Sequence, residues 1–195
     1  MKTSMNKPEK QMSYILLIIA LCFSACGQQK QKTNDKAMGK TEISAPEIPL
    51  TQAVVTGNLE AVKQHIEAGT NLDEKDALSG ATPLMSAITF DKTEIATVLI
   101  DAGADLEIKN NDGSTALHVA AFFGRVELVQ LLIDAKADKT VKNNYGATAQ
   151  ESVSGPFEDM KPIYEMMQQQ LGPIGLDLNL AEVEKARPVI AIMLQ

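Results

Sequence analysis

The stretch NNDGSTALHVAAFFGRVELVQLLIDAKADKTVK, residues 110–142, decides the fold of this chain. It opens with the turn signal Asp112-Gly113. Thr115 follows as a candidate helix N-cap, because its hydroxyl can accept a backbone N–H of the first helical turn. Apolar residues then recur at helical spacing up to Gly124, and a second apolar period begins after it. The stretch predicts two short helices joined by a tight turn, a unit that cannot bury its own apolar face.

The same unit recurs at a period of 33 residues, which the turn glycines Gly80, Gly113 and Gly146 share. The matching residues are GATPL at 80–84, GSTALHVAA at 113–121 and DAGAD at 101–105. This period, with Thr-Pro-Leu or Thr-Ala-Leu-His after a turn, resembles the ankyrin repeat. The resemblance covers about residues 46 to 171. It implies an all-α, ankyrin-repeat solenoid of about four helix–turn–helix units, and a binding function that names no partner.

The first 25 residues resemble a bacterial lipoprotein signal peptide. Three lysines precede an apolar run from Tyr14 to Phe23, which is too short to span a bilayer as a mature helix. Ser24-Ala25-Cys26 follows, and the resemblance implies cleavage before Cys26 coupled to lipidation of its thiol. Phe23 departs from the family pattern, which favours Leu at that position. An ordinary secretory signal or an uncleaved anchor is the alternative.

The segment after the signal is rich in Gln and Lys and poor in apolar residues, which predicts a disordered tether. The chain has 18 basic and 25 acidic residues, and removing residues 1–25 takes away three Lys and one Glu. A net charge of about −9 remains, which repels nucleic acid and anionic lipid headgroups. We therefore expect no binding to nucleic acid. From the signal resemblance we expect a protein that is lipid-anchored in the bacterial cell envelope and faces the periplasm or lies on the outer-membrane surface. We also expect a monomer.

The sequence predicts a C-terminal helical cap on the last repeat. The predicted domains are the lipoprotein signal peptide at 1–25, the lipidated tether at 26–45, repeats at about 46–79, 80–112, 113–145 and 146–172, and the cap at 173–195. We expect the second helix of repeat four at about residues 158–171. The apolar tail contains Pro188, which predicts one or two short helices, broken or kinked before it. A helix that binds a partner is the alternative for this tail.

The chain contains two histidines, His65 and His118. The resemblance implies that His118 ties neighbouring turns together by hydrogen bonds. Gln64 and His65 stand where later repeats have apolar residues, which predicts an N-terminal end face that meets water. Cys22 would leave with the signal peptide and Cys26 would carry lipid. No catalytic triad, phosphate loop or metal-ligand spacing is present in the sequence, so we predict no catalytic, cofactor-binding or metal site.

Loop chemistry also follows the repeat. Gly69 and Gly103 stand where a residue in the left-handed conformation ends a helix. Lys136 occupies the same position in repeat three, where we expect this conformation to be less favourable than for glycine. Asp105 and Asp138 recur two positions later, and we read them as acceptors for turn amides rather than metal ligands.

The predicted protein-binding surface is the concave face, built from first helices and hairpin tips. Phe122 and Phe123 end the first helix of repeat three, and Phe90 ends that of repeat two. We expect at least one of Phe122 and Phe123 to be exposed. The hairpin tips add Leu78, Asp112 and Tyr145.

These features predict a non-catalytic binding module that scaffolds or sequesters an envelope protein. The alternative is an accessory or regulatory subunit of an envelope enzyme, or a protein that binds a small molecule. A third reading, an enzyme that uses carboxylates, requires a deep polar pocket flanked by paired acidic residues.

Overall fold

The computed structural model describes residues 44–195. The predicted signal peptide, the predicted lipidation site Cys26 and most of the predicted tether lie outside the described residues. The helices in chain order are α2 (Leu50–Val55), α3 (Leu59–Glu67), α4 (Pro83–Thr89), α5 (Thr93–Asp101), α6 (Ala116–Phe122), α7 (Val126–Asp134), α8 (Ala149–Ser154), α9 (Phe157–Leu171), the 3-10 turn η1 (Gly172–Ile174) and α10 (Leu180–Met193). The described part of the chain is all-helical, as predicted.

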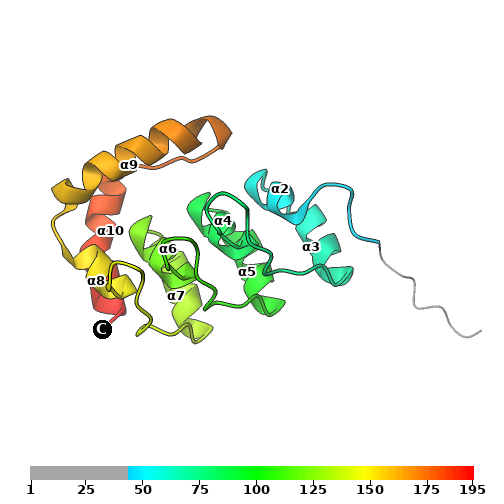
Figure 1. Ribbon diagram of the computed structural model, residues 1–195, viewed down its shortest axis with the longest axis horizontal. Coiled ribbons are helices and arrows are strands. Elements are labelled where there is room, and N and C mark those ends of the chain that lie inside the picture. The colour runs from blue at the N-terminus through cyan, green and yellow to red at the C-terminus, as the bar shows by residue number, and fades with distance from the viewer. Residues whose placement is uncertain (1–43) are drawn as a thin grey trace, which may run out of the picture. The chain divides into compact units, whose positions relative to one another are not determined.

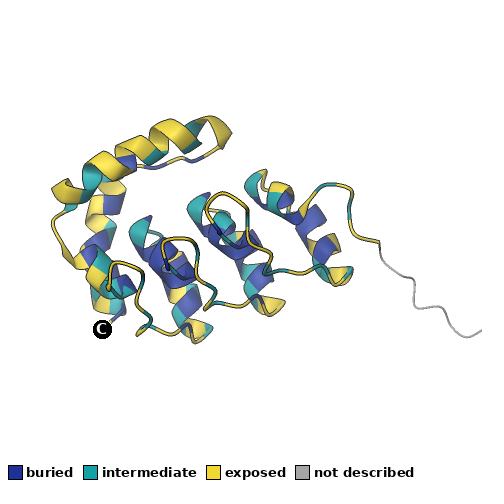
Figure 2. Ribbon diagram, in the orientation of Figure 1, coloured by how far each residue is buried: buried dark blue, intermediate teal, exposed yellow. Residues whose placement is uncertain are grey.

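The helices stack as repeated pairs. Figure 1 shows α2, α4, α6 and α8 in one row, and α3, α5 and α7 in a second row beside it. Each first helix packs on the next first helix, and each second helix on the next second helix. Figure 2 shows the buried residues on the facing sides of these pairs. The pairs therefore share one continuous core, which no single unit could form alone.

The repeated motifs explain why the helices start where they do. The hydroxyl of Thr82 accepts the backbone N–H of Met85 at 3.3 Å, and Pro83 occupies the first helical position. The second helices contribute Leu99, Leu128 and Leu132, each at most 1% exposed. Each fully buried leucine stabilises the stack by about 1.5–3 kcal/mol relative to leaving it exposed.

Two turn predictions are confirmed. Lys136 adopts φ +69°, in the left-handed region that Gly69 and Gly103 occupy in the earlier repeats. This conformation costs about 1–2 kcal/mol for a residue with a Cβ. Asp105 accepts the amide of Glu107 at 2.8 Å, and Asp138 accepts that of Thr140 at the same distance, so both acids stabilise turns.

The N-terminal end of the stack differs from the prediction. Gln64 is exposed, but His65 is only 4% exposed. Its Nε2 lies 2.8 Å from the Ile48 carbonyl oxygen and its Nδ1 lies 3.0 Å from the Thr70 hydroxyl. The expectation that His65 meets water is wrong, because the chain before α2 folds over the ring and satisfies it.

The C-terminal region contains the largest departure from the prediction. α10, rather than the helix at residues 157–171, packs against α8 and α7, as α7 packs against α6 and α5. It therefore takes the position of the second helix in repeat four. α10 is also one helix that continues through Pro188. Pro188 and Glu184 are both exposed, so water can hydrogen-bond the Glu184 carbonyl that Pro188 leaves without a donor.

α9 lies outside the regular stack. Figure 1 shows it extending over the ends of the first helices, and Figure 2 shows that most of its surface is exposed. Among the 15 residues of α9, Tyr164 is the only buried one. None of the helices in residues 44–195 has the length and apolar character that a bilayer crossing requires.

Candidate binding groove

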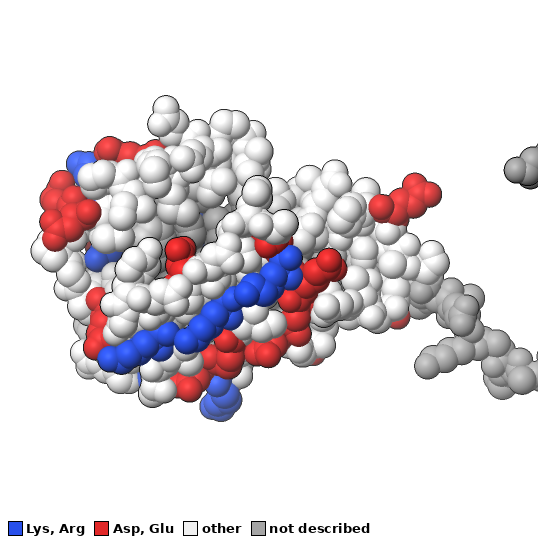
Figure 3. Space-filling model, in the orientation of Figure 1, with Lys and Arg blue, Asp and Glu red and all other residues white. Residues whose placement is uncertain are grey.

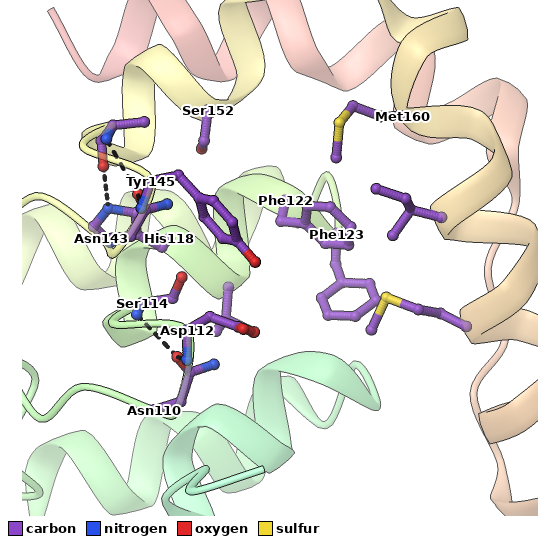
Figure 4. A pocket seen from close by; sticks show the side chains of 14 residues that line it. Asn110, Asp112, Ser114, His118, Phe122, Phe123, Asn143, Tyr145, Ser152 and Met160 are labelled. Atoms are coloured by element: carbon purple, nitrogen blue, oxygen red, sulfur yellow. Dashed lines mark hydrogen bonds between the residues drawn. The ribbon is translucent and has the colours of Figure 1, made fainter.

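A groove of about 500 Å³ lies between the hairpin tips, α6 and α9. We call it the α9 groove. Its polar wall comes from the hairpins and includes Asn110, Asp112, Ser114, Asn143 and Tyr145. Its apolar wall comes from α6 and α9 and includes Val119, Phe122, Met160, Ile163 and Met167. Figure 4 shows these two walls facing each other across open space.

Hydrogen bonds fix the hairpin wall. The Asn110 Oδ1 atom accepts the amides of Asp112 and Ser114 at 3.0 and 2.9 Å. Asn143 repeats this arrangement one unit later and accepts the amide of Tyr145 at 3.0 Å. The Asn144 amide N–H also donates to the Asp112 carbonyl at 2.9 Å, which joins one tip to the next. The tips therefore hold Asp112 and Tyr145 at fixed positions.

His118 links two repeats at the base of the groove. Its Nδ1 accepts the Thr115 amide at 3.3 Å, and its Nε2–H donates to the Ala147 carbonyl at 3.1 Å. Burial lowers the pKa of His118, and the Ala147 carbonyl only partly opposes this effect. Both ring nitrogens are occupied, so the neutral ring is a structural tie between repeats three and four, as the resemblance implied.

α9 is attached to the groove through Tyr164. The Tyr164 hydroxyl donates to the Phe122 carbonyl at 2.7 Å, and the two rings lie 4.6 Å apart. Arg187 of α10 donates to the Tyr164 oxygen at 3.1 Å and to the Gly155 carbonyl at 3.0 Å. Burial raises the pKa of Tyr164, and Arg187 opposes this rise, so the hydroxyl stays protonated. One tyrosine thus connects α9 to both α6 and α10.

The expectation of an exposed phenylalanine at the end of α6 is wrong. Phe123 is 4% exposed, and Phe122 is half-buried beneath Tyr164. Phe90 is 9% exposed. Phe122 is covered because Tyr164 of α9 packs on its ring, and the repeat pattern contains no signal for that contact.

The hairpin tips are exposed, with Leu78 and Tyr145 at 93% and 80%. The structure brings Asp112 and Tyr145 together with Phe122 and Phe123 around the α9 groove. Leu78 and Phe90 lie outside its lining. Whether any of these residues contacts a partner stays a prediction.

The α9 wall was not predicted from the sequence. Met160, Ile163 and Met167 follow helical spacing, which was the available signal. In the structure Ile163 is 40% exposed at the groove.

Asp112 is the only charged residue among those that line the groove. Figure 4 shows its carboxylate and the Tyr145 hydroxyl directed into the open space. Figure 3 shows this face hollowed beneath α9, with acidic side chains at the hollow and basic side chains in a line along the loops. Lysines on the loops donate to carbonyls of the next repeat, Lys75 to Lys109 at 2.7 Å and Lys109 to Lys142 at 2.9 Å.

The side chains that line the groove suit binding. His118 has no free nitrogen, and Asp112 has no second acid beside it in the lining. Within residues 44–195, no group of three or more His, Cys, Asp or Glu side chains is placed to hold a metal ion. An apolar wall opposite a polar wall instead suits contact with a partner that has both kinds of surface.

Comparison with known proteins gives the same architecture. Residues 50–143 match the family model described as ankyrin repeats in three copies. Human protein phosphatase 1 regulatory subunit 27 is 41% identical over 64 residues, which cover 33% of this chain and 41% of that protein. Mouse ankyrin repeat and SAM domain-containing protein 6 is 35% identical over 65 residues, 33% of this chain and 7% of that protein. This chain therefore spans less than half the length of either relative.

A solved structure is also similar. The crystal structure of the ankyrin repeat domain of Bcl-3, a member of the IkappaB protein family, superposes with a TM-score of 0.52 and 32% identity. The match covers 53% of this chain and 45% of that chain.

Proposed function

Since the chain is an ankyrin-repeat protein, we propose that it is a non-catalytic module that scaffolds or sequesters a partner protein in a bacterial cell envelope, and that the α9 groove holds a segment of that partner. The family match supports a protein-binding module. The groove, with apolar side chains left accessible on one wall and fixed polar groups on the other, supports the place of binding.

The accessible groove residues have the chemistry of interface anchors. Tyr145 is 80% exposed and Ile163 is 40% exposed, so both would lose contact with water when a partner binds. Tyrosine is enriched at interfaces, and methionines such as Met160 and Met167 adapt to partner surfaces of different shape. The hairpin wall of the α9 groove is therefore preformed, and the wall that carries the methionines can adapt to a partner.

The envelope location is supported by the N-terminal sequence. A basic segment, a short apolar run and a cysteine after small residues support lipidation at Cys26. The tether that follows would give the repeat domain a reach of roughly 25 Å from the membrane. Intact-mass analysis of the native protein and of Cys26→Ser tests this part of the proposal. A native mass without acyl chains would contradict it.

A regulatory role on an envelope enzyme is a second candidate. One relative is named as a regulatory subunit of a phosphatase, which supports this kind of role. A small-molecule site is supported by the groove volume of about 500 Å³, because small-ligand pockets commonly fall between about 300 and 1,000 Å³.

The proposal is tested by blocking the groove without disturbing the core. Ile163→Arg places a bulky cation on an exposed groove position, and Ile192→Arg places the same group on α10, where Ile192 is 67% exposed outside the groove. Quantitative affinity capture from envelope extract should lose its main protein with Ile163→Arg and keep it with Ile192→Arg. Equal capture by both variants, with unchanged circular dichroism, would place the binding surface elsewhere.

A further inference from the structure

Resting on the protein-binding function proposed above, we infer that the α9 groove selects a partner segment that presents a lysine or arginine side chain next to an apolar side chain. The partner would be a basic, amphipathic peptide segment. The charges, the free polar groups and the shape of the groove each support this chemistry.

The charge of the groove disfavours an acidic segment. Asp112 is the only charged residue in the lining, and no Lys or Arg belongs to it. Residues 44–195 contain 11 Lys and Arg against 22 Asp and Glu, a net charge of −11. The field of this part of the chain therefore attracts a cationic segment and repels an anionic one. The loop lysines Lys75 and Lys109 are engaged with backbone carbonyls and lie outside the lining.

Two of the polar groups that remain free, on Asp112 and Tyr145, can receive a cation. Asn110 and Asn143 use their side-chain oxygens on the tip amides, and both nitrogens of His118 are bonded. Within residues 44–195, the Asp112 carboxylate and the Tyr145 hydroxyl make no hydrogen bond to another side chain or to the backbone, and both point into the groove. A carboxylate accepts a charge-assisted hydrogen bond from Lys or Arg, and the face of a tyrosine ring attracts the same cation.

The opposite wall suits an apolar neighbour. Phe122, Met160 and Met167 give a surface on which the stem of a long basic side chain can lie beside an apolar residue. On α9, Ile163 and Met166 are 40% and 48% exposed, and Met166, which is not in the groove lining, follows Ile163 by three residues and widens the exposed apolar surface. This surface favours a peptide segment over a small cation, because a small cation would leave it uncovered.

Peptide selection tests the inference directly. A phage-displayed library of random dodecapeptides would be selected on the full-length chain, with counter-selection on Ile163→Arg. We expect enrichment of Lys or Arg next to Leu, Ile, Met or Phe. The most enriched peptide would then be synthesised and its Kd measured for the native chain, for Asp112→Asn and for Asp101→Asn, in which an exposed acid outside the groove is changed.

A double-mutant cycle combines the substitution in the chain with a substitution in the peptide. Asp112→Asn should weaken binding about tenfold or more, the size of one lost charge-assisted hydrogen bond. Replacing the basic residue of the peptide by Gln should cost a similar factor in the native chain and little more in Asp112→Asn. Asp101→Asn should bind as the native chain does. Affinity should also fall as salt is raised.

Other outcomes overturn the inference. Enriched peptides that need Ile163 but contain no basic residue would refute the charge selection and keep the protein-binding proposal. Equal effects of Asp112→Asn and Asp101→Asn would refute the role of Asp112. Nα-acetyl-lysine amide keeps a free side-chain ammonium group. If it displaced the peptide at a concentration equal to that of the peptide, the groove would be a small-cation site. Failure to enrich any peptide that distinguishes native chain from Ile163→Arg would refute both proposals, provided that circular dichroism shows both proteins folded.

Discussion

Tyr164 is the residue on which the position of α9 depends. It is fully buried, and its hydroxyl lies between the Phe122 carbonyl and Arg187. Arg187 is only 3% exposed, and among the described residues it makes no ion pair with an acid. A buried cation is costly unless its hydrogen bonds are satisfied. The tyrosine hydroxyl therefore stabilises both the Arg187 guanidinium and the Phe122 carbonyl.

Replacing that hydroxyl gives a direct prediction. Tyr164→Phe should lower the free energy of unfolding by about 1–3 kcal/mol, because it leaves a buried carbonyl and a buried guanidinium N–H without a partner. Urea unfolding of the full-length chain measures the change. Tyr145→Phe removes the same atom from an 80% exposed ring and should change stability by less than about 0.5 kcal/mol. Equal effects would mean that the link through Tyr164 contributes nothing.

His118 predicts how stability depends on pH. Burial holds its pKa below the ordinary 6.5, so the unfolded chain binds more protons than the folded chain as pH falls through that value. The free energy of unfolding should therefore decrease from pH 7 to pH 5. His118→Gln should reduce the slope of this decrease, whatever its effect on stability at pH 7. A slope unchanged by the substitution would show that His118 has the same pKa in both states.

At the scale of elements, α10 occupies the place in repeat four that was predicted for residues 158–171, and α9 forms the groove wall instead. The sequence predicts the second helix of repeat four at about residues 158–171, before the stop at Gly172-Pro173, and this stretch also has apolar residues at helical spacing. The structure gives that place to α10, whose Val183 and Ile190 are buried. Periodicity shows that a helix has an apolar side but not which neighbour covers it. The register of the first three repeats was predictable because the repeat motif itself fixes the neighbours. The α9 groove was not predictable, because no repeat motif covers α9.

The placement of α10 can be tested at a single glycine. A Cβ at Gly124 would lie 3.1 Å from the Cα of Val183, whereas a Cβ at Gly57, in the same turn of repeat one, meets only the flexible Lys92 side chain at 3.6 Å. Both glycines have positive φ, so each alanine variant should cost about 1–2 kcal/mol from backbone strain.

Gly124→Ala should cost roughly 1–3 kcal/mol more than Gly57→Ala, the typical price of overpacking, because α10 must shift. Thermal and urea unfolding of the two variants give the comparison. Equal losses would mean that α10 does not pack against the α6–α7 turn.

At the scale of the whole molecule, the repeats supply a rigid frame and α9 gives the frame a specific site. The stack of repeats could be predicted from the sequence because Gly80, Gly113 and Gly146 mark a fixed period, and each unit can bury its apolar face only against a neighbouring unit. The lining from the hairpin tips was partly predictable, since the period places Asp112 and Tyr145 at the tips. The α9 wall could not be predicted, because it depends on long-range contacts such as those of Tyr164 with Phe122 and Arg187.

The central claim is that a partner protein sits in the α9 groove. Site-specific photocrosslinking in the native cells tests it most directly, with p-benzoylphenylalanine placed at position 163 in the groove or at position 192 on α10. We predict that position 163 crosslinks one protein and that position 192 does not, although both side chains are exposed. Crosslinking of the same protein from position 192 with none from position 163, in a chain that still folds, would contradict the claim.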